Sequence, residues 1–161
     1  MSGHERAEGE RIVAGVDGSA SSVEALRWAV RQAELTGASV DAVIAWQYPA
    51  AAVGFGWGAI ADDTDYAELA AKAVAQAINQ AVDPASDVRV RPVVAHGYPA
   101  EVLTDHAAGA DLLVVGCRGH GGFTGALLGS VSQHCTHHAP CPVVVIRGRK
   151  ADCGDTPETR R

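Results

Sequence analysis

Short apolar runs alternate with segments of helical periodicity along most of this chain, and no other feature constrains the fold as strongly. Five of these runs are rich in β-branched residues and have the length of buried strands. They cover residues 11–17, 39–46, 88–94, 112–115 and 142–146. Because helical segments separate them, we predict an α/β domain with a parallel sheet, right-handed crossovers and helices on both faces.

The predicted helices carry their own start and stop signals. In the first, Ser21 and Glu24 have the spacing of a capping box, and Gly37 is placed to end the helix. Apolar residues repeat along it at helical spacing, which predicts one buried stripe. The other predicted helices cover residues 62–82, 99–108 and 130–138.

The order of the strands follows from one proline. Pro92 lies in the third strand and cannot donate a hydrogen bond to a neighbour, so this strand should be an edge. A doubly wound, five-stranded parallel sheet of order 3-2-1-4-5 satisfies this. In that order strands one and four are neighbours, and ligands of open α/β sheets bind where the strand order reverses.

A glycine-rich segment follows the fourth strand. It runs from Gly116 through Gly119, Gly121 and Gly122 to Gly129, and then meets Ser130, which we predict as the N-cap of the last helix. Glycines let the backbone approach a ligand, and the amide groups of a helix N-terminus attract phosphate. The alternative is a surface loop that binds nothing.

Side chains near this segment add to its binding potential. The hydroxyls of Ser130 and Ser132 could donate further hydrogen bonds, and Arg118 could add positive charge. The segment is not a P-loop, because Gly129 occupies the position before Ser130 where that motif has its lysine. Any phosphate would therefore be held mainly by backbone amides.

Asp17 ends the first strand, at the same predicted edge of the sheet. Its carboxylate could accept hydrogen bonds from ribose hydroxyls or join a metal shell. Equally, it could serve only an Asx-turn or helix cap. The convergence of Asp17 and the glycine segment on one crevice favours a binding site.

Composition excludes several classes of function. The chain has 161 residues and a net charge of −6, which argues against a broad nucleic-acid surface. We see neither a signal peptide nor a good transmembrane segment. With four cysteines and no secretion signal, we expect reduced thiols and a cytoplasmic protein. The domain should span residues 11–147, between a disordered tail at 1–10 and a flexible tail at 148–161.

Two segments have ambiguous roles. Residues 47–62 form a long connection that could lie over a ligand, contact a partner, or be a poorly ordered excursion. Histidines and cysteines also cluster near the last helix. Their spacing matches no standard zinc pattern, so we interpret them as structural filler and exposed histidines. These residues are His134, Cys135, His137, His138 and Cys141.

The motifs together resemble the nucleotide-binding branch of the universal stress protein family. That branch carries the motif G-x2-G-x9-G-[S/T], which Gly116, Gly119, Gly129 and Ser130 match. The resemblance extends to residues 13–19 and 140–146. It implies a Rossmann-like fold, similar to that of adenine nucleotide alpha hydrolases.

The resemblance also implies ATP as the ligand, with Mg²⁺ as a further expectation at Asp17. Asp17 would face the ribose, Val43 would meet the adenine through its backbone, and Gly15 would lie close to the nucleotide. The phosphates would be lined by Gly116, Arg118, Gly119, His120, Gly121, Gly122, Gly129, Ser130, Val131 and Ser132. Relatives of this kind commonly form homodimers through the last strand, here residues 143–146, and an exposed apolar edge independently favours pairing.

We weigh three functions on this basis. The first is an ATP-binding regulator of the stress response with little or slow hydrolysis. The second is a slow ATPase or phosphotransferase, for which the sequence offers only Asp17, Arg118 and His120. The third is an interaction module that needs no nucleotide. We expect no nucleic-acid or membrane partner.

Overall fold

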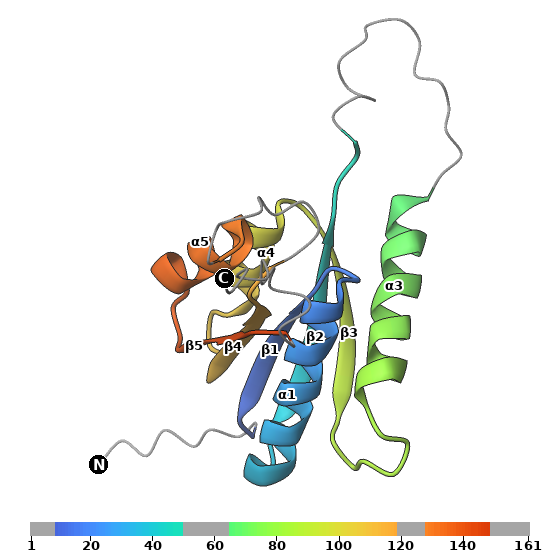
Figure 1. Ribbon diagram of the computed structural model, residues 1–161, viewed down its shortest axis with the longest axis vertical. Coiled ribbons are helices and arrows are strands. Elements are labelled where there is room, and N and C mark those ends of the chain that lie inside the picture. The colour runs from blue at the N-terminus through green and yellow to red at the C-terminus, as the bar shows by residue number, and fades with distance from the viewer. Residues whose placement is uncertain (1–8, 50–64, 119–127, 149–161) are drawn as a thin grey trace, which may run out of the picture.

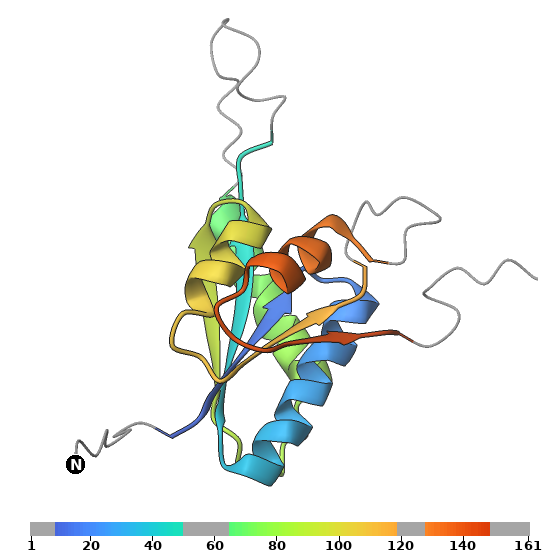
Figure 2. The same ribbon diagram turned by 90° about the vertical axis from the view of Figure 1, so that its left-hand side faces the viewer.

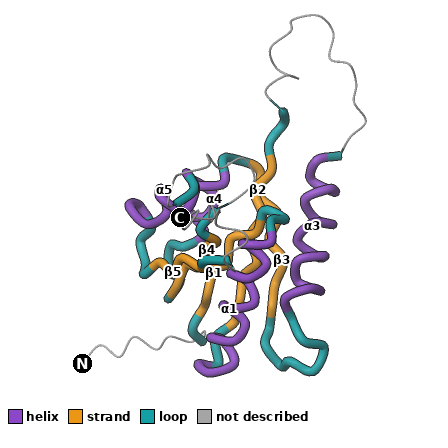
Figure 3. Tube along the Cα trace, in the orientation of Figure 1, coloured by secondary structure: helices purple, strands orange, loops and turns teal. Residues whose placement is uncertain are grey.

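The fold is known from a computed structural model, which describes residues 9–49, 65–118 and 128–148. Strands and helices alternate along these residues (Figure 3). The elements are β1 (Arg11–Val16), α1 (Ala20–Thr36), β2 (Ser39–Trp46), α3 (Tyr66–Ala81), β3 (Val90–His96), α4 (Pro99–His106), β4 (Leu112–Gly116), α5 (Ser130–His138) and β5 (Val143–Ile146).

The strands form one parallel sheet in the order β3-β2-β1-β4-β5, which confirms the predicted order. The central strand β1 pairs on one side with β2 and on the other with β4, so that Ile12 lies between Val40 and Leu112. Pro92 lies in the edge strand β3, as predicted. None of the helices in the described part of the chain is long and apolar enough to cross a membrane.

Helices cover both faces of the sheet and create two cores. On one face α1 and α3 pack side by side (Figure 1). The predicted apolar stripe of α1 is buried on this face and includes Val23, Leu26 and Val30. On the other face α4 and α5 cover β1, β4 and β5 (Figure 2). Because β1 and β4 are buried on both sides, their near-continuous apolar sequences are explained.

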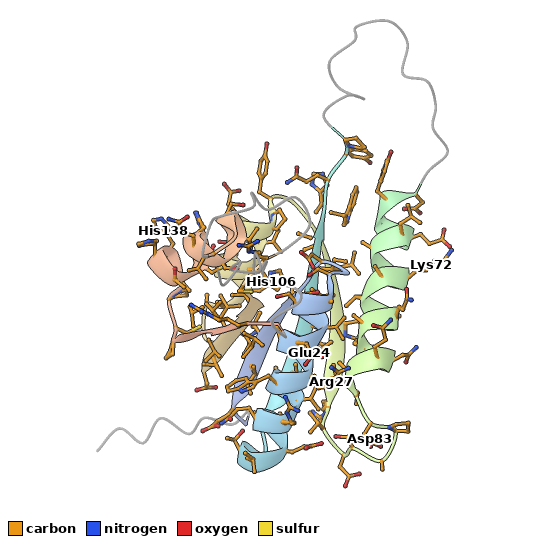
Figure 4. All side chains as sticks on the ribbon, viewed as in Figure 1. Glu24, Arg27, Lys72, Asp83, His106 and His138 are labelled. Atoms are coloured by element: carbon orange, nitrogen blue, oxygen red, sulfur yellow. The ribbon has the colours of Figure 1, made fainter. Side chains whose placement is uncertain are left out.

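The first helix begins earlier than predicted. Its N-cap is Ser19, which has an extended backbone and accepts a hydrogen bond from the amide of Ser22. Ser21 is therefore a buried residue inside the helix, and the predicted capping box with Glu24 is wrong. Glu24 instead pairs with Arg27 on the helix surface (Figure 4). The helix does end at Gly37, where φ is +76°.

The last helix, Ser130–His138, has the predicted bounds but not the predicted N-cap. Its N-cap is Gly129 and its first helical residue is Ser130, so the prediction of Ser130 as the cap is wrong by one position. Helix α3 starts at Tyr66 after the cap residue Asp65. Residues 1–8, 50–64 and 149–161, and thus most of the predicted tails and of the 47–62 connection, lie outside the described residues.

A buried carboxylate connects the first three strands at their amino ends. Asp41 on β2 is only 3% exposed. Its two oxygens accept bonds from Arg91 on β3 at 3.0 and 2.9 Å, and Arg11 on β1 adds another at 3.1 Å. Arg11 also donates to the carbonyls of His106 and Ala108 after α4. This network satisfies a charge that burial would otherwise disfavour strongly.

We predict that Asp41→Ala destabilises the fold by about 2–3 kcal/mol, because both arginines lose their buried partner. The matched control is Glu68→Ala, which removes the 2.9 Å pair with Lys72 on the exposed face of α3 (Figure 4). That pair is solvent-screened, so its loss should cost about 0.5 kcal/mol or less. Urea unfolding of both variants measures the difference. Equal losses would show that Asp41 contributes no more than a surface pair.

Candidate functional site

A cleft of about 300 Å³ lies at the carboxyl end of the sheet. It is formed where β1 and β4 are neighbours, which is the point at which the strand order reverses and α/β sheets bind ligands. Its lining comes from the ends of β1, β2 and β4 and from the first turns of α1, α4 and α5. The lining residues are Gly15, Val16, Asp17, Ser22, Val43, Ala45, Pro99, Leu103, Val115, Gly116, Arg118, Gly129, Ser130, Val131 and Ser132.

Every described residue that the sequence predicted for the site lines this cleft. These are Gly15, Asp17, Val43, Gly116, Arg118, Gly129, Ser130, Val131 and Ser132. The remaining predicted residues, Gly119, His120, Gly121 and Gly122, lie outside the described residues. Segments more than a hundred positions apart in the chain therefore meet where the sequence placed them.

An apolar wall was missed by the sequence analysis. Ala45, Leu103 and Val115 line the cleft beside Val43, and Pro99 lies with them at the start of α4. Ala45 and Val115 lie near the carboxyl ends of β2 and β4, which the sequence could have indicated. Leu103 comes from α4, and only the packing of that helix against the sheet brings it there.

Another part of the cleft wall is the N-terminus of α5. Within the described residues, no side chain caps this helix. The first amide that donates a hydrogen bond within α5 is that of Gln133, and its acceptor is the carbonyl of Gly129. The amides of Ser130, Val131 and Ser132 therefore have no partner within the helix, and they lie at the positive end of its dipole. Such a terminus favours an anionic ligand.

Ser132 has a different role from the one its hydroxyl suggested. Its side chain is buried, and its hydroxyl donates to the carbonyl of Gly116 at the end of β4. The amide of Gly129 donates a hydrogen bond to the backbone carbonyl of Cys117 at 2.7 Å. Both bonds fix the start of α5 against β4. The hydroxyl proton of Ser132 is thus used inside the protein, and Ser132 positions the helix terminus.

Asp17 has the structural role that the sequence offered, and it also lines the cleft. Its Oδ1 accepts bonds from the amide and the hydroxyl of Ser19, which is an Asx-turn at the start of α1. Its own amide donates to the hydroxyl of Ser22, which also lines the cleft. A carboxylate can accept about four hydrogen bonds in all. Asp17 is exposed at the cleft, so a ligand can reach its carboxylate while Oδ1 stabilises the turn.

Two glycines of the cleft are required by close packing. A Cβ on Gly116 would lie 2.3 Å from Ser21 Oγ and 2.9 Å from its carbonyl carbon, so α1 can approach β4 only because Gly116 has no side chain. A Cβ on Gly15 would lie 2.9 Å from the Cδ1 atom of Leu103. That neighbour is the end of a flexible side chain and can move into the cleft.

Cys135 and Cys141 are poorly suited to nucleophilic chemistry. Burial, together with the neighbouring Cys141, raises the pKa of Cys135 to about 11. Burial also raises the pKa of Cys141, against the opposing effect of Arg11. The thiolate is the reactive form, and a raised pKa reduces its share near neutral pH. The described residues contain no group of three histidine, cysteine or acidic side chains arranged to hold a metal.

Comparison with known proteins agrees with this geometry. Residues 9–147 match the family model described as the universal stress protein family. A universal stress protein of Mycobacterium tuberculosis is 36% identical over 142 residues, which cover 84% of this chain and 46% of that protein. The chain therefore spans about half the length of the curated relatives it matches.

Solved structures share the fold. Universal stress protein UspA from Lactobacillus plantarum is 26% identical with a TM-score of 0.67, and the match covers 87% of this chain and 99% of that one. A universal stress protein in complex with cAMP is 27% identical with a TM-score of 0.60, covering 86% and 97% of the two chains.

We predict that Gly116→Ala destabilises the fold by about 2 kcal/mol, because the new methyl group meets the backbone of Ser21 and neither element can move away freely. Gly15→Ala is the matched control, and it should cost about 1 kcal/mol or less because only the end of Leu103 must turn. Chemical denaturation measures both. A Gly116→Ala protein as stable as the parent chain would contradict the close approach of α1 and β4.

Proposed function

The chain belongs to the universal stress protein family, and on this premise we propose that it binds ATP in the cleft and acts as a nucleotide-dependent regulator of the stress response. The observation that carries the proposal is the pairing of an apolar wall with the uncapped N-terminus of α5 in one cleft. One wall suits a base and the other suits phosphate. The related structure in complex with cAMP supports an adenine nucleotide as the ligand class.

The base would lie against the apolar wall. Val43, Ala45, Leu103 and Val115 offer aliphatic surface, and the backbone of Val43 would supply polar contacts to the adenine. Burial of a flat heteroaromatic ring on aliphatic side chains is favourable, since it removes apolar surface from water. A cleft of about 300 Å³ is at the small end of ligand sites, which fits a base and sugar with phosphates extending toward α5.

The sugar and phosphates would meet the polar residues. Asp17 would accept hydrogen bonds from the ribose hydroxyls, while its other contacts hold the turn. The amides of Ser130, Val131 and Ser132 would donate to phosphate oxygens, with Arg118 adding charge. Gly119, His120, Gly121 and Gly122 belong to the same proposal through the glycine motif, although they lie outside the described residues.

Mg²⁺ would arrive with the nucleotide. Magnesium is usually held by one or two carboxylates, several waters and the substrate's phosphates. Asp17 fits as such a carboxylate because it is exposed at the cleft and can accept further bonds. The ion would neutralise phosphate charge. Among the described residues Asp17 is the one acidic side chain that lines the cleft.

The cleft supports binding better than hydrolysis. Phosphoryl transfer needs a positioned nucleophile and strong charge stabilisation. Neither a lysine nor a cysteine lines the described part of the cleft. We therefore propose slow hydrolysis at most. A nucleotide-independent interaction module is the competing function, and it predicts a cleft that stays empty at millimolar ATP.

Ser130→Pro tests the amide wall directly. Ser130 is the first residue of α5, where proline is well tolerated, and the extended backbone of Gly129 before it is compatible with proline. The substitution removes one amide donor and leaves the helix intact. We predict that ATP affinity, measured by calorimetry, falls roughly tenfold to a hundredfold, because a hydrogen bond to a charged phosphate is lost.

The matched control is Ser130→Ala, which keeps the amide and loses only the hydroxyl. It should bind ATP more tightly than Ser130→Pro. Denaturing the purified parent chain and identifying the released nucleotide by mass spectrometry then establishes the natural ligand. Equal affinity of a folded Ser130→Pro variant and the parent chain would contradict phosphate binding at α5. An empty protein that also ignores added ATP would favour the interaction module.

We further propose that the chain forms a homodimer through β5. This strand is an edge of the sheet, and its four residues, Val143–Ile146, are apolar and only partly buried. The carbonyls of Pro142 and Ile146 accept bonds from the β4 side. Since backbone groups alternate along a strand, those of Val143 and Val145 point to the open edge, where a second copy could pair.

Val145→Pro should convert this dimer to a monomer, because proline removes an outward amide without removing a bond to β4. Val145→Ala keeps the amide and should remain dimeric. Sedimentation velocity of both variants reads the oligomeric state, and circular dichroism checks that they are folded. A folded Val145→Pro protein that is still a dimer would place the contact elsewhere.

A further inference from the structure

The outer face of α5 carries two neighbouring imidazole rings. The rings of His134 and His138 lie with centroids 4.4 Å apart and planes inclined by 41°. They are four residues apart, so they occupy the same face of the helix on consecutive turns. Figure 4 shows His138 on α5, on the side of the molecule away from α1 and α3.

The structure separates this pair from the cysteines that follow it in sequence. Cys135 is fully buried in the core on the inner face of α5, and Cys141 packs against that core from the turn before β5. His138 is exposed and His134 is half-buried. The histidines and cysteines therefore do not form one closed tetrahedral site. What remains is an open pair of nitrogen ligands facing solvent.

The geometry of the pair suits a shared metal ion. Imidazole nitrogens bind zinc at about 2.0–2.1 Å, which puts the centroids of two rings on one tetrahedral ion roughly 5 Å apart. The observed 4.4 Å is close to that spacing, so side-chain rotations can bring one nitrogen of each ring to a shared ion. Two histidines four residues apart on a helix are a known way of presenting nitrogen ligands to zinc.

The position of His138 on the helix also favours the binding of a cation. His138 is the last residue of α5, where the negative end of the helix dipole favours a cation. A nine-residue helix leaves its last carbonyls without intrahelical partners, so the local field is not cancelled. Water would supply the remaining ligands, since within the described residues no third side chain completes a metal cluster.

We propose that His134 and His138 form a binding site for a late first-row divalent metal ion such as Zn²⁺, Ni²⁺ or Cu²⁺. Imidazole is a preferred ligand for these ions, and Mg²⁺ or Ca²⁺ would not bind because both prefer oxygen. The site lies at the end of α5 opposite the nucleotide cleft. It is therefore independent of the proposed nucleotide function and can fail or succeed separately.

The test is calorimetric titration of the full chain, free of any affinity tag, with Ni²⁺ as the probe. Two linked ligands bind roughly a hundredfold tighter than one, because the second bond forms within the same molecule. Affinity for Ni²⁺ should therefore fall by about that factor in His138→Gln and equally in His134→Gln. Ni²⁺ should also raise the thermal midpoint of the parent chain but not of either variant.

The matched control is His137→Gln. His137 is exposed on the same turn of α5, but its ring centroid is 6.3 Å from that of His138, farther than the 4.4 Å between His134 and His138. Its loss should leave Ni²⁺ affinity unchanged. The proposal is overturned if all three variants bind Ni²⁺ as the parent chain does, or if His137→Gln loses as much affinity as His138→Gln. Circular dichroism confirms that each variant is folded.

Discussion

The close approach of α1 to the carboxyl end of β4 is the contact on which the rest of the site depends. Gly116 packs against Ser21 so closely that no Cβ would fit between them. The carbonyl of Gly116 accepts a hydrogen bond from the buried hydroxyl of Ser132. One residue thus brings together a strand and the N-termini of two helices on opposite faces of the sheet. The cleft exists because these helices can come this close without a side chain between them.

Much of this arrangement could be predicted from the sequence, because it follows from local signals. Pro92 identified the edge strand, Gly37 ended α1, and the glycine motif placed α5 at the cleft. The errors arose where two similar signals competed. Ser19 and Ser21 both suit a helix cap, and only the backbone conformation decides between them. Residue spacing alone could not make that choice.

Other features depend on tertiary packing and left no local signal. Leu103 reaches the cleft because α4 packs on β1, and Ser132 turns inward because β4 offers a carbonyl at the right place. Gly116 was predicted as a ligand-lining residue, and it does line the cleft, but its strictest requirement is the approach of α1. A glycine in a binding motif can therefore be demanded by the scaffold as much as by the ligand.

The buried ion network at the amino ends of β1, β2 and β3 gives the sheet two unlike ends. The hydration of charged groups becomes less favourable on heating, so the cost of burying Asp41 with Arg11 and Arg91 falls as temperature rises. The cleft end depends instead on the close packing of Gly116 against Ser21 and on the hydrogen bond from the hydroxyl of Ser132 to the carbonyl of Gly116. Warming should therefore loosen the sheet first at the carboxyl ends of its strands. A bound nucleotide would protect the molecule at that end, where heat weakens it most.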